Sequence, residues 1–211
     1  MISSYRLGDL VLLQCLHINE VNEIVKEHPN SIGSKYILEK RKNNFECDIH
    51  NIKKEYANNI HIITKIVVEY IEQNLDFLPK DITESTVIHV RLGDVIAGNE
   101  DHEKIKRPLA IDYMKSIVSN DTNKKYVIGK CFFAKTSSTN YEECIQLSNE
   151  YLHNVINELQ AEYFNSGNAD IDLCCAVKSK LFIQGKGFFS KLIVEIRKKL
   201  NLKSIETTTY D

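Results

Sequence analysis

The stretch 86-TVIHVRLGD-94 decides the fold that we expect for this chain. Its first five residues are mostly β-branched, which is typical of a short strand buried on both faces of a parallel sheet. The stretch then runs directly into Arg91, Gly93 and Asp94, which are not needed merely to end a strand. It therefore predicts a central strand that carries a polar site at its carboxyl end.

After this strand the pattern alternates between helix and strand. We expect a helix from Pro108 to about Val118, a strand over Tyr126–Phe133, a helix capped by Ser138 or Thr139 and reaching Phe164, a helix over Ile171–Val177, a strand over Leu181–Gln184 and a helix over Phe188–Leu200. Such alternation favours a parallel sheet covered by helices on both faces. The fold class that follows is α/β and Rossmann-like, with ligands bound after Val90, Phe133 and Gln184.

The first 84 residues are expected to be a short, mostly helical part, set apart from a ligand-binding domain over residues 85–211. A helix over Asn19–Glu27 is ended by Pro29. A longer helix is expected over Asp48–Gln73, with Asp48 as its N-cap. The run Leu7–Leu13 fits either a strand or the start of a helix.

Composition excludes several function classes. The chain has 211 residues, with 27 basic and 29 acidic side chains, and this balance argues against a nucleic-acid-binding protein. Its six cysteines form no CxxC pair, so we expect reduced thiols. The apolar run Leu10–Leu13 is too short for a membrane span or a signal peptide. These features lead us to expect a cytoplasmic protein.

Several residue types at the end of the first strand suit an anion. His89 and Arg91 are two residues apart and share one face of an extended chain. Arg91 offers a planar fork of donors that matches phosphate oxygens. Gly93 permits a sharp turn, and Asp94 can orient Arg91. The alternative is structural, with an Arg91–Asp94 ion pair that closes the turn and a core histidine at position 89.

A second stretch, 185-GKGFFS-190, lies between a strand and a helix, where free N–H groups suit phosphate. Its spacing differs from that of a Walker A loop, and an ordinary glycine-containing turn is the alternative. Asp170 and Asp172 form a DxD pair that could hold a metal or cap a helix. No His-rich metal motif is present in the sequence, so we expect no metal.

These stretches together resemble a known family. HVRLGD at 89–94 resembles the HxRxGD signature of the α1,2-, α1,6- and protein O-fucosyltransferase superfamily. The helix opening PLAIDYM at 108–114, then Asp172, the strand Leu181–Ile183 and the turn ending in Phe189-Ser190 extend the likeness. The resemblance covers about residues 85–200, which correspond to the donor-binding half.

The resemblance implies a GT-B-like donor domain and a metal-independent, inverting transfer from a GDP-sugar, with GDP-fucose the first candidate. Arg91 would contact the β-phosphate, and His89 would lie beside the phosphates or the sugar. Asp172 would accept hydrogen bonds from guanine. Ser190 and the backbone N–H groups from Gly187 to Phe189 would hold phosphate oxygens, with Gly93 and Asp94 completing the donor site.

The resemblance also suggests how the acceptor, a glycan or another hydroxyl compound, would lose its proton. Glu100 lies near the position where the α1,6 enzymes carry an acidic residue, and Glu103 is close by. We favour Glu100; the alternative is a solvated loop carboxylate.

Two departures keep other functions open. Leu92 stands where relatives carry a second arginine, so another GDP-hexose is a possible donor. The acceptor-side region, residues 1–84, is short. One alternative is a non-catalytic module that binds a nucleotide-sugar, or a subunit that needs a partner for its acceptor site. Another is an interaction protein in which HVRLGD is only a turn. The protein could also form a homo-oligomer.

Overall fold

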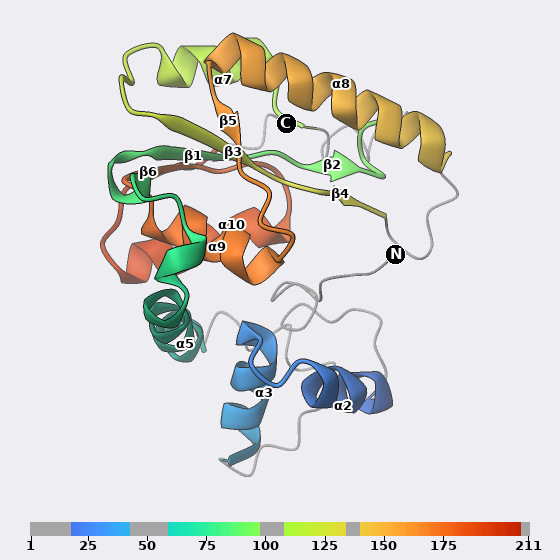
Figure 1. Ribbon diagram of the computed structural model, residues 1–211, viewed down its shortest axis with the longest axis vertical. Coiled ribbons are helices and arrows are strands. Elements are labelled where there is room, and N and C mark those ends of the chain that lie inside the picture. The colour runs from blue at the N-terminus through green and yellow to red at the C-terminus, as the bar shows by residue number, and fades with distance from the viewer. Residues whose placement is uncertain (1–17, 43–58, 98–107, 134–139, 208–211) are drawn as a thin grey trace.

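The centre of the molecule is a five-stranded sheet whose strands are all parallel. The computed structural model describes residues 18–42, 59–97, 108–133 and 140–207. In spatial order the strands are β5 (Glu162–Tyr163), β3 (Lys125–Ile128), β1 (Thr86–His89), β6 (Leu181–Ile183) and β7 (Ser204–Ile205). The α/β, Rossmann-like architecture is confirmed, with β1 at the centre (Figure 1).

A second, smaller ladder continues two of these strands beyond the carboxyl edge of the sheet. Strand β2 (Leu92–Gly93) pairs in parallel with β4 (Cys131–Phe132). The predicted strand Tyr126–Phe133 is therefore two short strands. Gly129, with φ of +151°, lies between them. A Cβ at this position would lie 2.2 Å from the Val90 carbonyl oxygen, so only glycine fits where the chain approaches Val90.

Helices cover both faces of the sheet, as expected for parallel strands. Helices α7 (Ile111–Val118) and α8 (Tyr141–Leu159) lie on one face, and α9 (Ala169–Lys178) and α10 (Phe188–Lys199) lie on the other (Figure 1). Successive residues of β1 point to opposite faces. Val87 belongs to the core cluster on the α9 and α10 side, while Ile88 belongs to the cluster on the α7 and α8 side.

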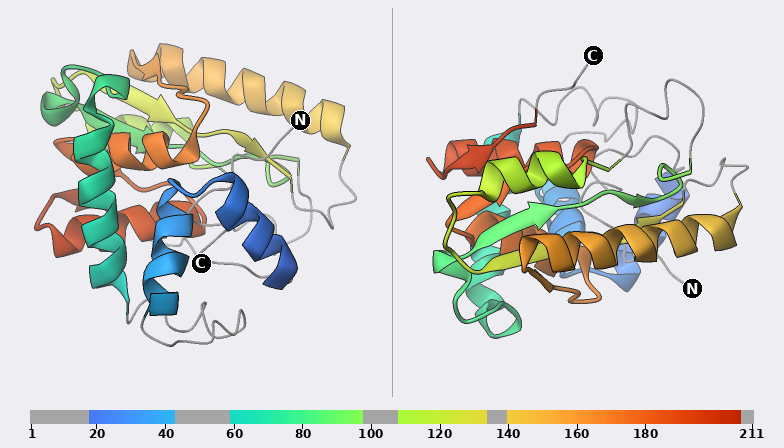
Figure 2. Two further views of the ribbon diagram at one scale, coloured as in Figure 1. Left: turned by 60° about the horizontal axis from the view of Figure 1, so that its bottom comes forward. Right: turned by 90° about the horizontal axis from the view of Figure 1, so that it is seen from above.

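The amino-terminal helices form a further layer outside α9 and α10. They are α2 (Ile18–Glu27), α3 (Ile32–Lys42) and α5 (Ile60–Gln73), and Figure 2 shows α3 and α5 side by side. Two 3₁₀ turns, η1 (Leu75–Phe77) and η2 (Ile82–Glu84), then lead into β1. Buried residues of α3 and α5 share one core cluster with α9 and α10. The division into residues 1–84 and 85–211 stays a prediction.

Three predicted helix starts are wrong. Helix α5 begins at Ile60 with Asn59 as its N-cap, whereas Asp48 lies outside the described residues. Helix α7 begins at Ile111, after the extended Ala110, so Pro108 precedes it instead of opening it. Helix α8 begins at Tyr141, because the Asn140 side chain accepts a hydrogen bond from the amide of Glu143; Ser138 and Thr139 lie outside the described residues.

Helix α8 also ends earlier than predicted. Gln160 adopts a left-handed conformation with φ of 49° and its amide bonds back to the last turn. The chain is then free to form β5, which pairs with β3. Sequence periodicity missed β5 and β7 because each has only two residues, too few for an alternating pattern.

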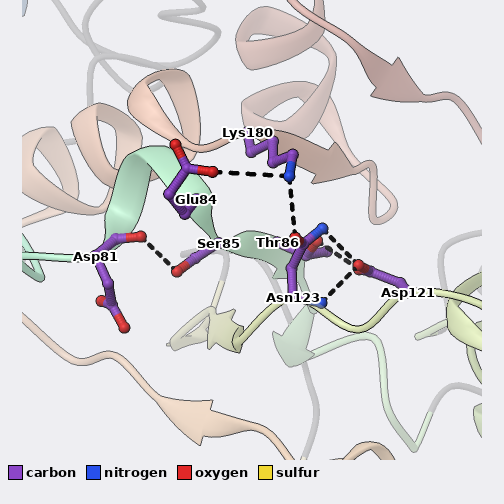
Figure 3. Close-up of polar contacts among 7 residues, drawn as sticks. All are labelled: Asp81, Glu84, Ser85, Thr86, Asp121, Asn123 and Lys180. Carbon is purple, nitrogen blue, oxygen red and sulfur yellow. Dashed lines mark hydrogen bonds and ion pairs between the residues drawn. The ribbon is translucent and has the colours of Figure 1, made fainter.

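The amino edge of the sheet is closed by a network of polar side chains (Figure 3). Thr86 at the start of β1 donates to the Asp121 carboxylate at 2.5 Å, and Asn123 donates to the same carboxylate from its backbone and side chain. Lys180 lies 3.2 Å from the Asn123 side-chain oxygen and 3.7 Å from the Glu84 carboxylate. Each buried polar group here has a partner that belongs to the protein.

Arg197 belongs to the same edge and is fully buried. Its guanidinium donates to five backbone carbonyls, those of Ala176, Val177, Ser179, Lys180 and Lys203. Three of these distances are 2.8 Å, and Nε donates to Ser204 at 3.0 Å. Burial lowers the pKa of Arg197 to about 10. The side chain stabilises the carboxyl end of α9, where helix carbonyls lack partners.

Candidate functional site

A pocket opens at the carboxyl edge of the sheet, where the connections β1–β2, β3–β4 and β6–α10 meet. It is lined by His89, Val90, Arg91, Leu92, Lys130, Phe132, Lys186, Gly187 and Phe189. Its volume is about 30 Å³, which is room for about two water molecules. The enclosed part of the pocket therefore fits one small polar group, and a larger ligand would extend out of it past the lining side chains.

Arg91 lies in this pocket with its side chain 26% exposed. The predicted ion pair is present, but Nη2 is 3.5 Å from the Asp94 carboxylate, longer than the 2.7–2.9 Å of a charge-assisted hydrogen bond. The Nε atom is buried and has no hydrogen-bond partner among the described residues. The ion pair therefore leaves part of the donor fork of Arg91 unused.

Two glycines of the β6–α10 connection make room for the two predicted side chains. A Cβ on Gly185 would lie 2.2 Å from the carbonyl oxygen of His89 and 2.5 Å from its Nδ1. A Cβ on Gly187, where φ is +95°, would lie 2.7 Å from Nη1 of Arg91. Gly185 therefore packs against His89, and Gly187 packs against Arg91.

The amino end of α10 adds donors to the same place. Gly187 is the N-cap residue and has no side chain to cap the helix, and the Lys191 amide makes the first helical bond, to the Gly187 carbonyl at 3.3 Å. The amides of the first turn precede this ladder, and the helix end carries a partial positive charge. Ser190 is fully buried, and its Oγ has no partner among the described residues.

His89 lies at the end of β1 with only 6% of its surface exposed. Its ring lies 5.4 Å from that of Phe189, tilted by 47°. His89 and Arg91 both line the pocket, as their spacing predicts. The Phe189 ring thus holds His89 against the first turn of α10.

Gly93 and Asp94 stabilise the turn that follows β1. Gly93 has φ of +93°, and a Cβ would lie 2.2 Å from the Phe132 carbonyl oxygen. Its amide donates to the buried Ser148 hydroxyl at 3.0 Å, and the Asp94 amide donates to Phe132 at 2.9 Å. Gly93 therefore allows β2 to pack closely on β4, and Asp94 reaches the site through Arg91. Neither lines the pocket directly.

The two aspartates of the DxD pair lie in the first turn of α9, outside the pocket lining. Asp172 accepts from the hydroxyl of Ser166 at 2.6 Å. Asp170 accepts from the amide of Ile32, the first residue of α3, at 2.9 Å. Burial raises the pKa of Asp170 to about 6. Both carboxylates make contacts within the protein. Neither is the N-cap of α9, which is Asn168, whose side chain accepts from the Asp170 amide. The guanine contact of Asp172 stays a prediction.

Lys130 is a pocket residue that the sequence analysis missed. It lies between β3 and β4 and lines the pocket beside Arg91. A single lysine after a strand carries no recognisable signal, because any surface turn accepts one. Lys186 lies between the two glycines and also lines the pocket. It adds a further positive charge, which favours the phosphate-binding interpretation of that turn.

The candidate base Glu100 lies outside the described residues, as does Glu103. Among the described residues no group of three or more histidine, cysteine, aspartate or glutamate side chains could hold a metal ion. No described helix has the length and apolar character needed to cross a membrane.

Comparison with protein-family models and with curated proteins gives no match for this chain. The chemistry of the site therefore rests on its geometry. The Arg91 guanidinium, Lys130 and Lys186 line the pocket, and the amino end of α10 begins beside it, so its donors suit an oxyanion with several oxygens. Ser190, which was expected to hold a phosphate oxygen, is fully buried and is not part of the pocket lining.

Proposed function

We propose that this protein is a metal-independent glycosyltransferase and that the pocket binds a phosphate of its nucleotide-activated sugar. One observation carries the proposal. Arg91 Nε and Ser190 Oγ are both buried without partners among the described residues, and they belong to the elements that meet at the first turn of α10. Leaving a buried donor unpaired costs about 1–3 kcal/mol, and Arg91 lines the pocket, so a ligand there that accepts from its Nε is stabilised.

In the proposed reaction an acceptor hydroxyl oxygen bonds to the anomeric carbon of the donor sugar. The bond from that carbon to the β-phosphate oxygen breaks, and its electron pair leaves with the nucleoside diphosphate. The configuration at the anomeric carbon inverts, and the acceptor proton passes to a carboxylate, for which Glu100 is the candidate by resemblance.

Arg91 and the amino end of α10 act on the leaving group. Negative charge develops on the β-phosphate as the bond breaks, and fixed donors stabilise it most in the transition state. Removing one such donor typically lowers the rate about 10²- to 10³-fold. His89 would position the phosphates or the sugar. The cationic side chains supply charge that a divalent metal provides in other enzymes.

The finer assignment comes from the HVRLGD resemblance. By that likeness the sheet is the donor-binding half of a GT-B-type fold, the donor is a GDP-sugar, and fucose is the first candidate sugar. Leu92, which lines the pocket without charge, leaves other GDP-hexoses as candidates. The acceptor would be a glycan or another hydroxyl compound.

A thermal-shift panel of nucleotides and nucleotide-sugars tests the proposal. GDP and GDP-fucose at millimolar concentration should raise the melting temperature, since a ligand at 100 times its Kd stabilises the folded state by about 2.7 kcal/mol. UDP and dTDP forms in the same panel report base specificity. Arg91→Ala should abolish the shift, and Arg41→Ala, which removes an arginine of α3 that donates to Asn22 of α2, should keep it.

Transfer is then measured with labelled donor. Release of the sugar to an acceptor or to water supports an enzyme. Binding of GDP without either reaction favours the alternative, a nucleotide-sugar-binding module or a subunit that needs a partner. If no nucleotide moves the melting temperature, and Arg91→Ala lowers it without ligand, HVRLGD is only an ion-paired turn and the proposal is wrong.

A further inference from the structure

Lys130 occupies a position that the fold fixes from several sides. The neighbouring Gly129 packs against Val90, where any Cβ would overlap the Val90 backbone. The Gly129 carbonyl accepts a hydrogen bond from the Tyr163 hydroxyl at 2.6 Å. On the other side, Cys131 starts β4 and pairs with Leu92. A lysine that only solubilises a surface turn needs no such support.

The register places Lys130 next to Arg91. Strands β2 and β4 pair in parallel with Leu92 opposite Cys131, so Arg91 and Lys130 occupy the preceding position of the two chains. Both side chains line the same pocket, together with Lys186 from the β6–α10 connection. Like charges opposite each other on neighbouring strands repel and destabilise the pairing. An anion bound between them removes that cost.

The charges of this pocket are not balanced within the described part of the protein. Three cations, Arg91, Lys130 and Lys186, line it, and Asp94, which pairs with Arg91, supplies one negative charge. No described carboxylate forms an ion pair with either lysine, although each side chain is partly buried. The excess of positive charge matches a ligand with at least two negative charges.

We infer that Lys130 is a ligand-binding residue that holds a second phosphate group, next to the one held by Arg91 and the amino end of α10. The inference rests on the proposed function, which it sharpens from a phosphate to a diphosphate. It also offsets the missing charge at Leu92, because Lys130 brings a cation to the same pocket from the neighbouring strand.

Titration calorimetry with inorganic pyrophosphate and inorganic phosphate tests the inference without any need for catalysis. Lys130→Gln should raise the Kd for pyrophosphate about 10- to 100-fold, the effect of one lost hydrogen bond to a charged group, and the Kd for phosphate less than about threefold. Lys130→Arg should restore pyrophosphate binding to within about fivefold of wild type. The matched control is Lys180→Gln, which removes a lysine from the amino edge and should change neither Kd (Figure 3).

The outcomes separate this inference from the proposed function. If wild type binds pyrophosphate and GDP, and Lys130→Gln binds both as well as wild type does, Lys130 is not a binding residue and the proposed function stands. An equal loss for phosphate and pyrophosphate also overturns the second-phosphate role. If wild type binds neither pyrophosphate nor GDP, both proposals fail. Melting curves of each variant check that it is folded.

Discussion

Arg197 and Arg91 lie at the two ends of helix α10, Arg197 in its last turn and Arg91 beside the glycine that precedes its first. At the amino edge of the sheet, Arg197 gives its donors to backbone carbonyls and is fully buried. At the carboxyl edge, the one described ion pair of Arg91 is with Asp94, at 3.5 Å, and its buried Nε has no partner among the described residues.

The two edges therefore serve different purposes. Polar groups at the amino edge are satisfied within the protein, so they stabilise the fold and leave nothing for a ligand (Figure 3). At the carboxyl edge, Arg91 Nε and Ser190 Oγ have no partner among the described residues, and the Asp170 carboxylate is buried, so these groups cost stability until a ligand or a proton arrives. By this contrast we interpret Arg197 as a structural arginine and propose that Arg91 binds a ligand.

The largest effect is expected at the amino edge. Arg197→Met leaves five buried carbonyls without their donor and should lower the free energy of unfolding by about 3–5 kcal/mol. Urea unfolding followed by circular dichroism measures it. Arg197→Lys keeps the charge but not the planar fork, so it should recover less than half of the loss. A midpoint unchanged in Arg197→Met would show that the carbonyls find other donors.

The next largest effect is a gain in the free energy of unfolding, expected for a substitution of Asp170 at the carboxyl edge. Burial raises the pKa of Asp170 from 3.8 to about 6, so the folded state keeps a proton that the unfolded state releases between these values. Stability from this group is fully present below pH 4 and is lost as the pH rises through 6. Asp170→Asn should remove this slope and raise stability at pH 7 by up to about 2 kcal/mol.

Unfolding curves of wild type and Asp170→Asn from pH 4 to 7 test this. Asn still accepts from the Ile32 amide, so the contact with α3 is kept. The interpretation is contradicted if the two proteins show parallel pH dependence across this range.

A smaller effect is expected at Gly187. An alanine there places a Cβ 2.7 Å from Nη1 of Arg91 at a φ of +95°, so it should strain the backbone and displace the guanidinium. We expect a stability loss of about 1 kcal/mol and about a tenfold weaker binding of GDP. Gly167→Ala is the matched control, because φ is +77° there and nothing lies within 4 Å of the new Cβ. Equal GDP affinity in both variants would refute the displacement.

The smallest stability effect should come from Arg91 itself. Without ligand, Arg91→Met should change the free energy of unfolding by less than about 1 kcal/mol, because its ion pair is partly exposed and it lies beside Lys130. The comparison with Arg197→Met in the same urea series decides the contrast. If the Arg91 variant loses as much stability as the Arg197 variant, both arginines are structural.

Much of the fold could be predicted from the sequence. The strand at 86–90 and the helices at 19–27, 171–177 and 188–200 all agree with the structure to within two residues, because each has a clear hydrophobic pattern. The ends that were wrong depend on contacts with other parts of the chain. Strand β5 forms only because β3 is beside it, and the break at Gly129 follows from its approach to Val90.

Part of the candidate site could be predicted because its residues adjoin elements that have a clear hydrophobic pattern. His89, Arg91, Gly187 and Phe189 line one pocket because each follows or precedes an element that the sequence pattern already placed. Asp172 was expected with them, but it lies in the first turn of α9, and its carboxylate accepts from Ser166 in the preceding loop.

The sequence by itself determined a parallel α/β sheet and the face that His89 and Arg91 share, since strand periodicity is local. Only the tertiary structure decided that Lys130 stands beside Arg91, that Gly187 makes room for its guanidinium, and which arginine is satisfied by carbonyls. The physical reason is that hydrogen-bond partners and charge neighbours come from distant strands and helices. Residue spacing along one chain does not encode which of them meet.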